Sequence, residues 1–274
     1  MLRMTLVAAL AALTAPAPLS AGAPERATAE QPSESWEMLR GELFGERAIL
    51  DGGGMISIDA PYRAEDAAIV PIGLSIVPGP GRRVDRLTLV IDENPVPVAA
   101  EFEFGHAMGP AVELSVRVRV NAYTNVRAIA ELDDGSLYQT ARFVKASGGC
   151  SAPALKDRDA AMASLGEMRL RAFAAPTAGS DARPEAQVMV RHPNNSGFQL
   201  DPLTQLYIPA LFVDELSVTQ GGEPLFRMTG GISISENPTV RFRYTPNGAG
   251  TIEVIAHDTK GREFRESFPV GRSS

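Results

Sequence analysis

The sequence predicts an all-β protein made of two β-sandwich domains, joined by a flexible linker that carries the single cysteine and preceded by a short N-terminal helix. Three observations indicate this class. Short runs of alternating or β-branched residues recur along the chain, turn-forming residues separate them, and one stretch rich in Gly, Ser and Pro divides them into two blocks. With 274 residues, 44% of them hydrophobic, the chain is long enough to give each block a core.

The chain begins with the pattern of a secretory signal peptide, predicted at residues 1–23. Arg3 supplies the positive start, Leu6 to Leu13 is an unbroken apolar stretch, and small-residue cleavage sites follow at Ala21-Gly22-Ala23 or Ala27-Thr28-Ala29. The alternative is a membrane anchor, but the apolar stretch is about half of the roughly 20 residues that a spanning helix needs. We therefore expect export to the bacterial periplasm, without membrane insertion after signal cleavage.

The first block, residues 33–145, begins with a predicted helix over Ser35–Phe44, for which Ser33 or Ser35 is the expected N-cap. The apolar side chains that share one side of this helix are Trp36, Met38, Leu39 and Leu43. The predicted strands that follow are Met55–Ile58, Ala68–Val77, Arg86–Ile91, Val96–Phe104, Val112–Val120, Ala122–Leu132 and Leu137–Lys145.

One of these strands shows the alternating pattern most clearly. Apolar residues at 114, 116, 118 and 120 alternate with Ser115, Arg117 and Arg119. Since successive side chains of a strand point to opposite faces, this period of two places the apolar residues in a core and the polar residues in water.

The second block, residues 165–272, has the same character and predicts a second small sandwich. Its predicted strands are Met168–Phe173, Ala186–His192, Leu211–Thr219, Pro224–Met228, Thr239–Tyr244, Thr251–Ile255 and Glu263–Val270. Phe242 and Tyr244, the turn signal at 246–250, and then Ile252 and Val254 predict a β-hairpin with a longer loop.

Between the blocks lies the predicted linker, residues 146–164, with Cys150 near its start and a brief helical turn at Asp157–Ser164. Exported proteins usually pair their cysteines or lack them, so a lone cysteine is either unused or functional. Glycine, serine and proline surround Cys150, as in a mobile, solvated segment. We therefore expect an exposed thiol that other proteins can reach.

Other site types lack support in the sequence. The net charge of −7 and the absence of Lys/Arg clusters argue against nucleic acid. The glycine run at 52–54 lacks the context of a phosphate loop, and Asp133-Asp134 has no spaced set of oxygen ligands after it, so both predict turns. His192 is expected to stabilise a turn or an interface, and His106 and His257 to be solvated or hydrogen-bonded. No cofactor site and no metal site emerge.

Several runs of residues, at the cysteine and in the second block, follow the pattern of known protein families. Gly148-Gly149-Cys150, at the end of an exported sandwich, resembles the carrier arm of SoxY. The runs that resemble SoxZ are Val190–Phe198, Ile208-Pro209, Phe212-Val213, Gly222–Phe226 and Asn237–Phe242. The arrangement is similar to the fused SoxYZ-like carriers associated with periplasmic quinoprotein alcohol dehydrogenases.

The resemblance implies immunoglobulin-like sandwiches and a carrier of thiosulfate oxidation, without turnover of its own, that holds a small sulfur-containing intermediate covalently on Cys150. Gly148, Gly149 and Ser151 would form the arm, whose freedom comes from the glycines, and the implied partners are Sox-type enzymes or quinoprotein dehydrogenase and cytochrome c systems. The chain departs from the family pattern because Ser151 and Ala152 replace trailing glycines and the chain continues into a second domain.

Two other functions remain open. The chain could be a non-covalent binding or assembly module for a periplasmic quinoprotein (PQQ) alcohol dehydrogenase system, which would use the thiol little or not at all. It could also be an autonomous thiol enzyme, although no His or Asn stands near Cys150 in the sequence.

Overall fold

The computed structural model describes residues 30–153, 158–173 and 183–270. The predicted signal peptide and part of the predicted linker lie outside the described residues. Among the described residues, no helix combines the length and the apolar composition required to cross a bilayer.

The first half of the chain folds as a helix followed by a series of strands, as predicted. Its elements are α2 (Glu34–Phe44), β1 (Ile49–Asp51), β2 (Ile56–Asp59), β3 (Val70–Ile76), β4 (Val84–Ile91), β5 (Val98–Phe104), the 3₁₀ helix η1 (His106–Met108), β6 (Val112–Val118), β7 (Thr124–Leu132) and β8 (Leu137–Val144). The sequence did not predict the short elements β1 and η1, because three residues are too few for a periodic pattern.

The second half starts with a short helix where a helical turn was expected. Its elements are α3 (Arg158–Ala163), β9 (Met168–Phe173), β10 (Glu185–Val190), β11 (Val213–Gln220), β12 (Glu223–Gly230), β13 (Thr239–Arg243), β14 (Thr251–Asp258) and β15 (Glu263–Pro269). All seven predicted strands of this block are present.

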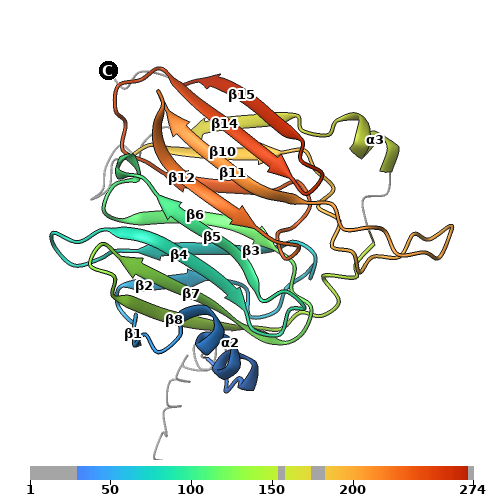
Figure 1. Cartoon of the computed structure of the whole chain (residues 1–274), viewed down its shortest axis with the longest axis horizontal. Helices are drawn as coiled ribbons and strands as arrows, with labels where there is room; N and C mark the ends of the chain where they lie inside the picture. The colour runs from blue at the N-terminus through green and yellow to red at the C-terminus, as the bar shows by residue number, and fades with distance from the viewer. Residues whose placement is uncertain (1–29, 154–157, 174–182, 271–274) are drawn as a thin grey trace, which may run out of the picture.

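The two halves are joined edge to edge in both layers of the sandwich. A nine-stranded sheet has the order β1-β8-β7-β4-β5-β12-β11-β14-β15, and a six-stranded sheet has the order β2-β3-β6-β13-β10-β9 (Figure 1). The crossing points are the antiparallel pairs β5/β12 and β6/β13, so each half contributes strands to both layers. The two predicted sandwiches are present, but each of the two sheets continues from the first half into the second.

A single hydrophobic core also crosses from one half into the other. Phe226 of β12 contacts Phe102 of β5 and Phe242 of β13, with ring centroids 6.0 and 5.0 Å apart. These three rings are at most 2% exposed. Separating the halves would expose them and break two strand pairs, so the seam between the halves is a fixed part of the fold.

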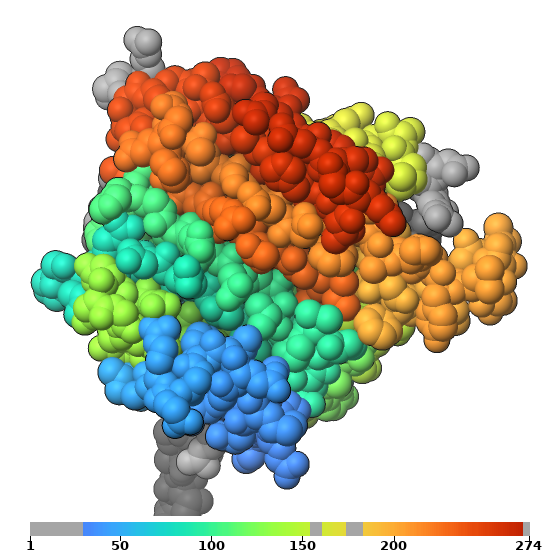
Figure 2. Space-filling view, in the orientation of Figure 1, coloured from blue at the N-terminus to red at the C-terminus, as the bar shows by residue number. Residues whose placement is uncertain are grey.

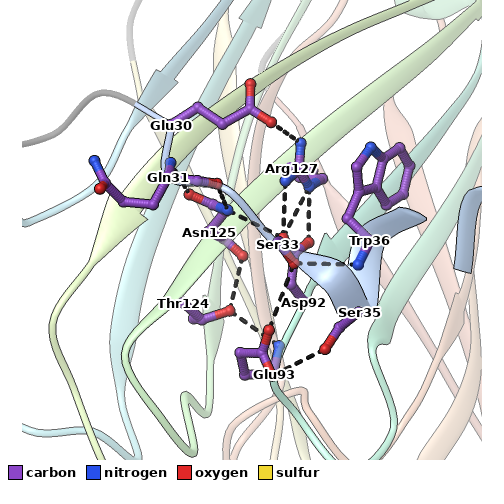
Figure 3. Close-up of polar contacts among 10 residues, drawn as sticks. All are labelled: Glu30, Gln31, Ser33, Ser35, Trp36, Asp92, Glu93, Thr124, Asn125 and Arg127. Atoms are coloured by element: carbon purple, nitrogen blue, oxygen red, sulfur yellow. Dashed lines mark hydrogen bonds and ion pairs between the residues drawn. The ribbon is translucent and has the colours of Figure 1, made fainter. Parts of the chain in front are cut away.

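Helix α2 lies on the outer face of the nine-stranded sheet and is held there by one buried side chain, Trp36. Ser33 is its N-cap, because the Ser33 hydroxyl accepts a hydrogen bond from the Trp36 N–H at 3.1 Å. The guanidinium of Arg127 lies over the Trp36 ring, with its Cζ 4.7 Å from the ring centroid, and it forms an ion pair with the buried Asp92 (Figure 3). Glu30, which precedes the helix, forms a second ion pair with the same guanidinium. A cation-π contact and a buried ion pair thus anchor the helix.

Two predictions about local structure were wrong. The predicted apolar face of the helix is only partly buried, since Met38 is 69% exposed and only Trp36 is fully covered. The predicted hairpin does not form, because β13 lies in the six-stranded sheet and β14 in the nine-stranded sheet. After β13 the Tyr244 N–H donates to Pro184 O and the Thr245 N–H donates to Ala107 O. The chain then crosses to the nine-stranded sheet, where it forms β14.

Candidate functional site

Cys150 lies in a tight turn that follows β8 and packs against the seam between the halves. The Gly148 N–H donates to Asn121 O at 2.9 Å, and the Gly149 N–H donates to Val120 O at 3.0 Å. Both acceptors belong to the connection between β6 and β7. The turn is thus hydrogen-bonded to the body of the first half rather than extended into solvent.

The prediction of an exposed thiol was wrong, because Cys150 is 1% exposed. Its neighbours in the turn, Ser147, Gly148 and Ser151, are exposed as their composition suggested. The second half also contacts this turn, because the Ser196 hydroxyl donates a hydrogen bond to the Cys150 carbonyl, 46 positions away in the sequence. Local composition predicted a mobile, solvated segment, and it could not predict which distant loop packs against it.

The two glycines before the cysteine, which were predicted to give an arm its freedom, each have a structural role in the docked turn. Gly148 has φ of +77°, a left-handed conformation that glycine adopts without strain. A Cβ on Gly149 would lie 2.1 Å from Ala67 O and 2.6 Å from Val120 O. Gly149 is therefore required for the turn to pack closely against the first half.

The covering loop of the second half runs over residues 192–199; it is hydrogen-bonded, and residues 192–196 and Gln199 are buried. Ser196 accepts from the Phe198 N–H at 3.2 Å, and its own N–H donates to the Gln199 side chain at 3.0 Å. His192 is buried and its Nδ1 accepts from the Asn194 N–H at 3.1 Å, which agrees with the turn-stabilising role predicted for it. Burial lowers the pKa of His192, so the ring is neutral at pH 7.

One charged group, Arg119, acts on the thiol from the end of β6. The sequence placed Arg119 on the solvent face of its strand, and this was wrong: it is 2% exposed, because the segment at 233–234 covers it. Its N–H donates to Ser233 O at 2.7 Å, and its Nη1 donates to Ile234 O. A regular alternation predicts the side of a strand correctly only where the strand continues, and β6 ends at Val118.

Burial and Arg119 have opposite effects on the thiol. Burial raises the pKa of the Cys150 thiol, and the positive charge of Arg119 lowers it, with a net rise above the ordinary value. The docked thiol is therefore protonated near neutral pH and a weak nucleophile. Among the described residues no hydrogen bond joins a histidine to Cys150.

Beyond the covering loop the chain forms a projecting segment, residues 198–208, which we call the finger. It stands out from the body of the molecule at the right edge of Figure 2. Its ends are joined by the hydrogen bond from Ile208 N–H to Gln199 O at 2.8 Å. Leu203, Leu206 and Tyr207 are 92%, 69% and 68% exposed. The finger thus places an apolar surface on the same loop that covers Cys150, a feature that the sequence analysis did not find.

Family models cover most of the described chain. The model of the sulfur oxidation protein SoxY matches residues 40–150 and ends on Cys150, and the model of the sulphur oxidation protein SoxZ matches residues 173–269. None of the curated proteins matches the chain.

Solved structures resemble parts of the chain. The sulfur carrier protein SoxY from Chlorobium limicola f thiosulfatophilum is 27% identical, over 41% of this chain and 91% of that protein, with a TM-score of 0.35. A superoxide reductase (neelaredoxin) from Ignicoccus hospitalis is 15% identical, over 33% of this chain and 79% of that protein, with a TM-score of 0.28. With TM-scores this low, the family assignment rests on the sequence models.

Proposed function

Because the chain belongs to the SoxY and SoxZ families in tandem, as a fused SoxYZ-like protein, we propose that it is a periplasmic carrier that holds a small sulfur-containing intermediate covalently on Cys150. The carrier has no turnover of its own and presents its cargo to separate enzymes of sulfur oxidation. Location in the periplasm rests on the signal peptide expected at residues 1–23.

The observation that supports this proposal most strongly is the place of Cys150 in the chain. It is the only cysteine, it stands at the last residue of the SoxY match, and it lies where the two halves meet. A thiolate forms bonds to sulfur that thiol exchange can reverse, which is the chemistry that a sulfur carrier needs.

Burial of the thiol means that the carrier has a closed state. In it the thiol is protonated and shielded, and cargo can be loaded only after the turn lifts away from the seam. The turn is built for such a movement, because Ser147, Gly148 and Ser151 are exposed and only Gly149 and Cys150 are covered. Opening breaks a few hydrogen bonds and leaves both sheets intact.

The finger is the surface on which we expect the enzyme that loads or unloads Cys150 to bind. Gln199, at the base of the finger, accepts from Ser196, and Ser196 donates to the Cys150 carbonyl. An enzyme that reaches the thiol must therefore approach this loop. A groove lined with apolar side chains fits Leu203 and Leu206, whose exposure to water is otherwise unfavourable.

The second candidate is the assembly module for a quinoprotein dehydrogenase system, and the observation in its favour is the 1% exposure of Cys150. In that case the thiol is a structural part of the seam. Docking would use the finger or another surface, and cargo chemistry would play no part.

Replacing Cys150 by serine in the native host separates the two functions. The carrier predicts that sulfur-compound oxidation is lost while the variant folds with an unchanged Tm to within a few degrees. The assembly module predicts full pathway activity. Ser147→Ala, an exposed change in the same turn, is the matched control and should retain activity under both functions.

A further inference from the structure

We propose that His192 is an acid-sensitive latch on the covering loop, and that a proton on its Nδ1 loosens this loop from the body of the second half and from the Cys150 turn. The inference goes beyond the proposed function, because it concerns when the loop is closed and holds whatever the thiol carries.

The ring of His192 is held in one protonation state by a backbone group. Its Nδ1 lies 3.1 Å from the backbone nitrogen of Asn194, and because a backbone N–H can only donate, Nδ1 is the acceptor. The proton of the neutral ring is therefore on Nε2, which lies 3.5 Å from Oδ2 of Asp258. A second proton, on Nδ1, would set two N–H groups against each other and break the bond to Asn194.

The carboxylate beside Nε2 does not offset a positive charge on the ring. Asp258, at the end of β14, already accepts from Nε of Arg262 at 2.7 Å and from the N–H groups of Lys260 and Arg262. Since the ring is 1% exposed, an imidazolium would lose its hydration and lie near the charge of Arg262. Burial accordingly lowers the pKa of His192, an effect that Asp258 opposes and Arg262 adds to.

Titration of the ring is coupled chiefly to this one ion pair, since Asp258 and Arg262 are the charged groups that shift the pKa of His192. Other charged residues on the elements around the ring are Arg191, Asp214 on β11 and Glu236 on the segment before β13. Glu236 acts on Arg117 and Arg119 instead.

The bond to Nδ1 fixes the first turn of the covering loop. Asn194 has φ of +44°, a left-handed conformation that is uncommon for residues other than glycine. Besides its N–H bond to the ring, its side-chain oxygen accepts from the Val213 N–H at 3.1 Å and its side-chain nitrogen donates to Ile234 O at 3.4 Å. Loss of the bond to the ring removes one of the three contacts that hold this conformation.

Two residues further along, the same loop contacts the Cys150 turn. The Ser196 hydroxyl donates to the Cys150 carbonyl, and the Ser196 N–H donates to the side chain of Gln199 at the base of the finger. A loop that moves at Asn194 carries these contacts with it. We therefore expect acid to loosen the cover of the turn and the base of the finger together.

The direction of the pH effect follows from the shifted ring. A released His192 has the ordinary pKa of 6.5 and the docked ring has a lower one, so the docked loop is stable above pH 6.5 and loses stability as the pH falls below it. If the pKa of the docked ring lies below 5, the equilibrium for release should rise about twentyfold between pH 7 and pH 5.

Amide hydrogen exchange of the full-length mature protein, followed by mass spectrometry from pH 8 to pH 5, measures this release. The exchange rate of a peptide in urea, divided by its rate in buffer at the same pH, gives a protection factor that is free of the intrinsic pH dependence. For peptides over residues 194–199 we expect this factor to fall about twentyfold between pH 7 and pH 5 and to stay below that of β4 and β7. Protection that does not change with pH, or that equals that of β4 and β7 at every pH, would overturn the proposal.

The thiol of Cys150 reports on the link to the turn. Its protection against an aromatic disulfide, taken as the same ratio of rates in urea and in buffer, should fall in acid together with that of the loop. A loop that loosens in acid while Cys150 keeps its full protection would contradict this link.

His192→Asn tests whether His192 is the group that titrates. The asparagine side-chain oxygen can accept in place of Nδ1 but binds no proton, so the pH dependence should vanish. His257→Asn is the matched control, because His257 is also on β14, is 38% exposed and lies 3.2 Å from Glu263, and it should keep the twentyfold change.

Persistence of the pH dependence in His192→Asn, or its loss in His257→Asn, would contradict the assignment. If His192→Asn does not fold, the comparison of the loop with β4 and β7 in the wild-type protein still decides.

Discussion

Substituting Ser196 by alanine tests whether the second half keeps the Cys150 turn closed. The hydroxyl of Ser196 is buried and donates to the Cys150 carbonyl, and alanine leaves that carbonyl without this donor. An acceptor that loses its partner inside a protein costs about 1–3 kcal/mol. The closed state loses this stabilisation and the open state does not, so we expect the open population to rise about tenfold, which corresponds to about 1.4 kcal/mol.

The free energy of opening the Cys150 turn in the wild-type protein can be estimated from the contacts that opening breaks. Opening breaks the bonds of Gly148 and Gly149 to the first half and that of Ser196 to the cysteine, each worth about 1 kcal/mol. Exposure of the thiol side chain adds about 1 kcal/mol. The total of about 4 kcal/mol corresponds to an open fraction of about one in a thousand, so the folded protein should react about a thousandfold more slowly than the unfolded chain.

The assay is the rate of reaction of Cys150 with a small aromatic disulfide at pH 7.5, in buffer and in urea. Ser196→Ala should react about tenfold faster than wild type in buffer and at the same rate in urea. Ser217→Ala is the matched control, because its hydroxyl contacts Glu215 at 3.4 Å on β11, and it should stay within twofold of wild type. A folded Ser196→Ala protein that reacts at the wild-type rate would refute the role given to the covering loop.

Three further changes test other parts of the structure. Gly149→Ala places a Cβ 2.1 Å from a backbone oxygen, so the turn should stay undocked and Cys150 should react at nearly the rate of the unfolded chain; a wild-type rate would contradict this. Asp92→Asn leaves the buried Arg127 without its buried anion, with only the half-exposed Glu30 carboxylate still paired to it, and should lower the free energy of unfolding by about 3–5 kcal/mol in urea titrations, whereas Glu30→Gln should change it by less than about 1 kcal/mol. Because folding raises the pKa of the Cys150 thiol, its contribution to stability should be intact below the ordinary value of 9.0 and fall by about 1.4 kcal/mol per pH unit above it; a wild-type minus Cys150→Ser difference that stays flat up to pH 11 would contradict this.

Most of the fold could be predicted from the sequence because its signals are local. The N-cap at Ser33 and the period of two in β6 each depend on residues close together in the chain, and both agree with the structure. Edge pairing between the halves was not predictable in this way. The contacts of β5 with β12 join residues more than 120 positions apart, and no local pattern records the partner of a strand edge.

In the candidate site, too, local features were predictable from the sequence and long-range contacts were not. The sequence identified Cys150, because a lone cysteine between glycines and serines is a local feature, but it predicted a mobile segment where the structure has a docked turn. The docked turn is hydrogen-bonded to Ser196 at the Cys150 carbonyl, and the charge near it depends on Arg119, which local alternation assigned to solvent. Both belong to the seam, and the seam exists only once the two halves have paired.

The central claim is that Cys150 carries covalent sulfur cargo in the cell, although its thiol is buried when unloaded. The most direct test is the intact mass of the protein isolated from its native host during growth on a reduced sulfur compound, before and after treatment with reductant. The carrier predicts an added mass of one or more sulfur atoms, with or without a sulfonate, that reductant removes and that Cys150→Ser lacks. An unmodified thiol under every growth condition that supports sulfur oxidation would contradict the claim.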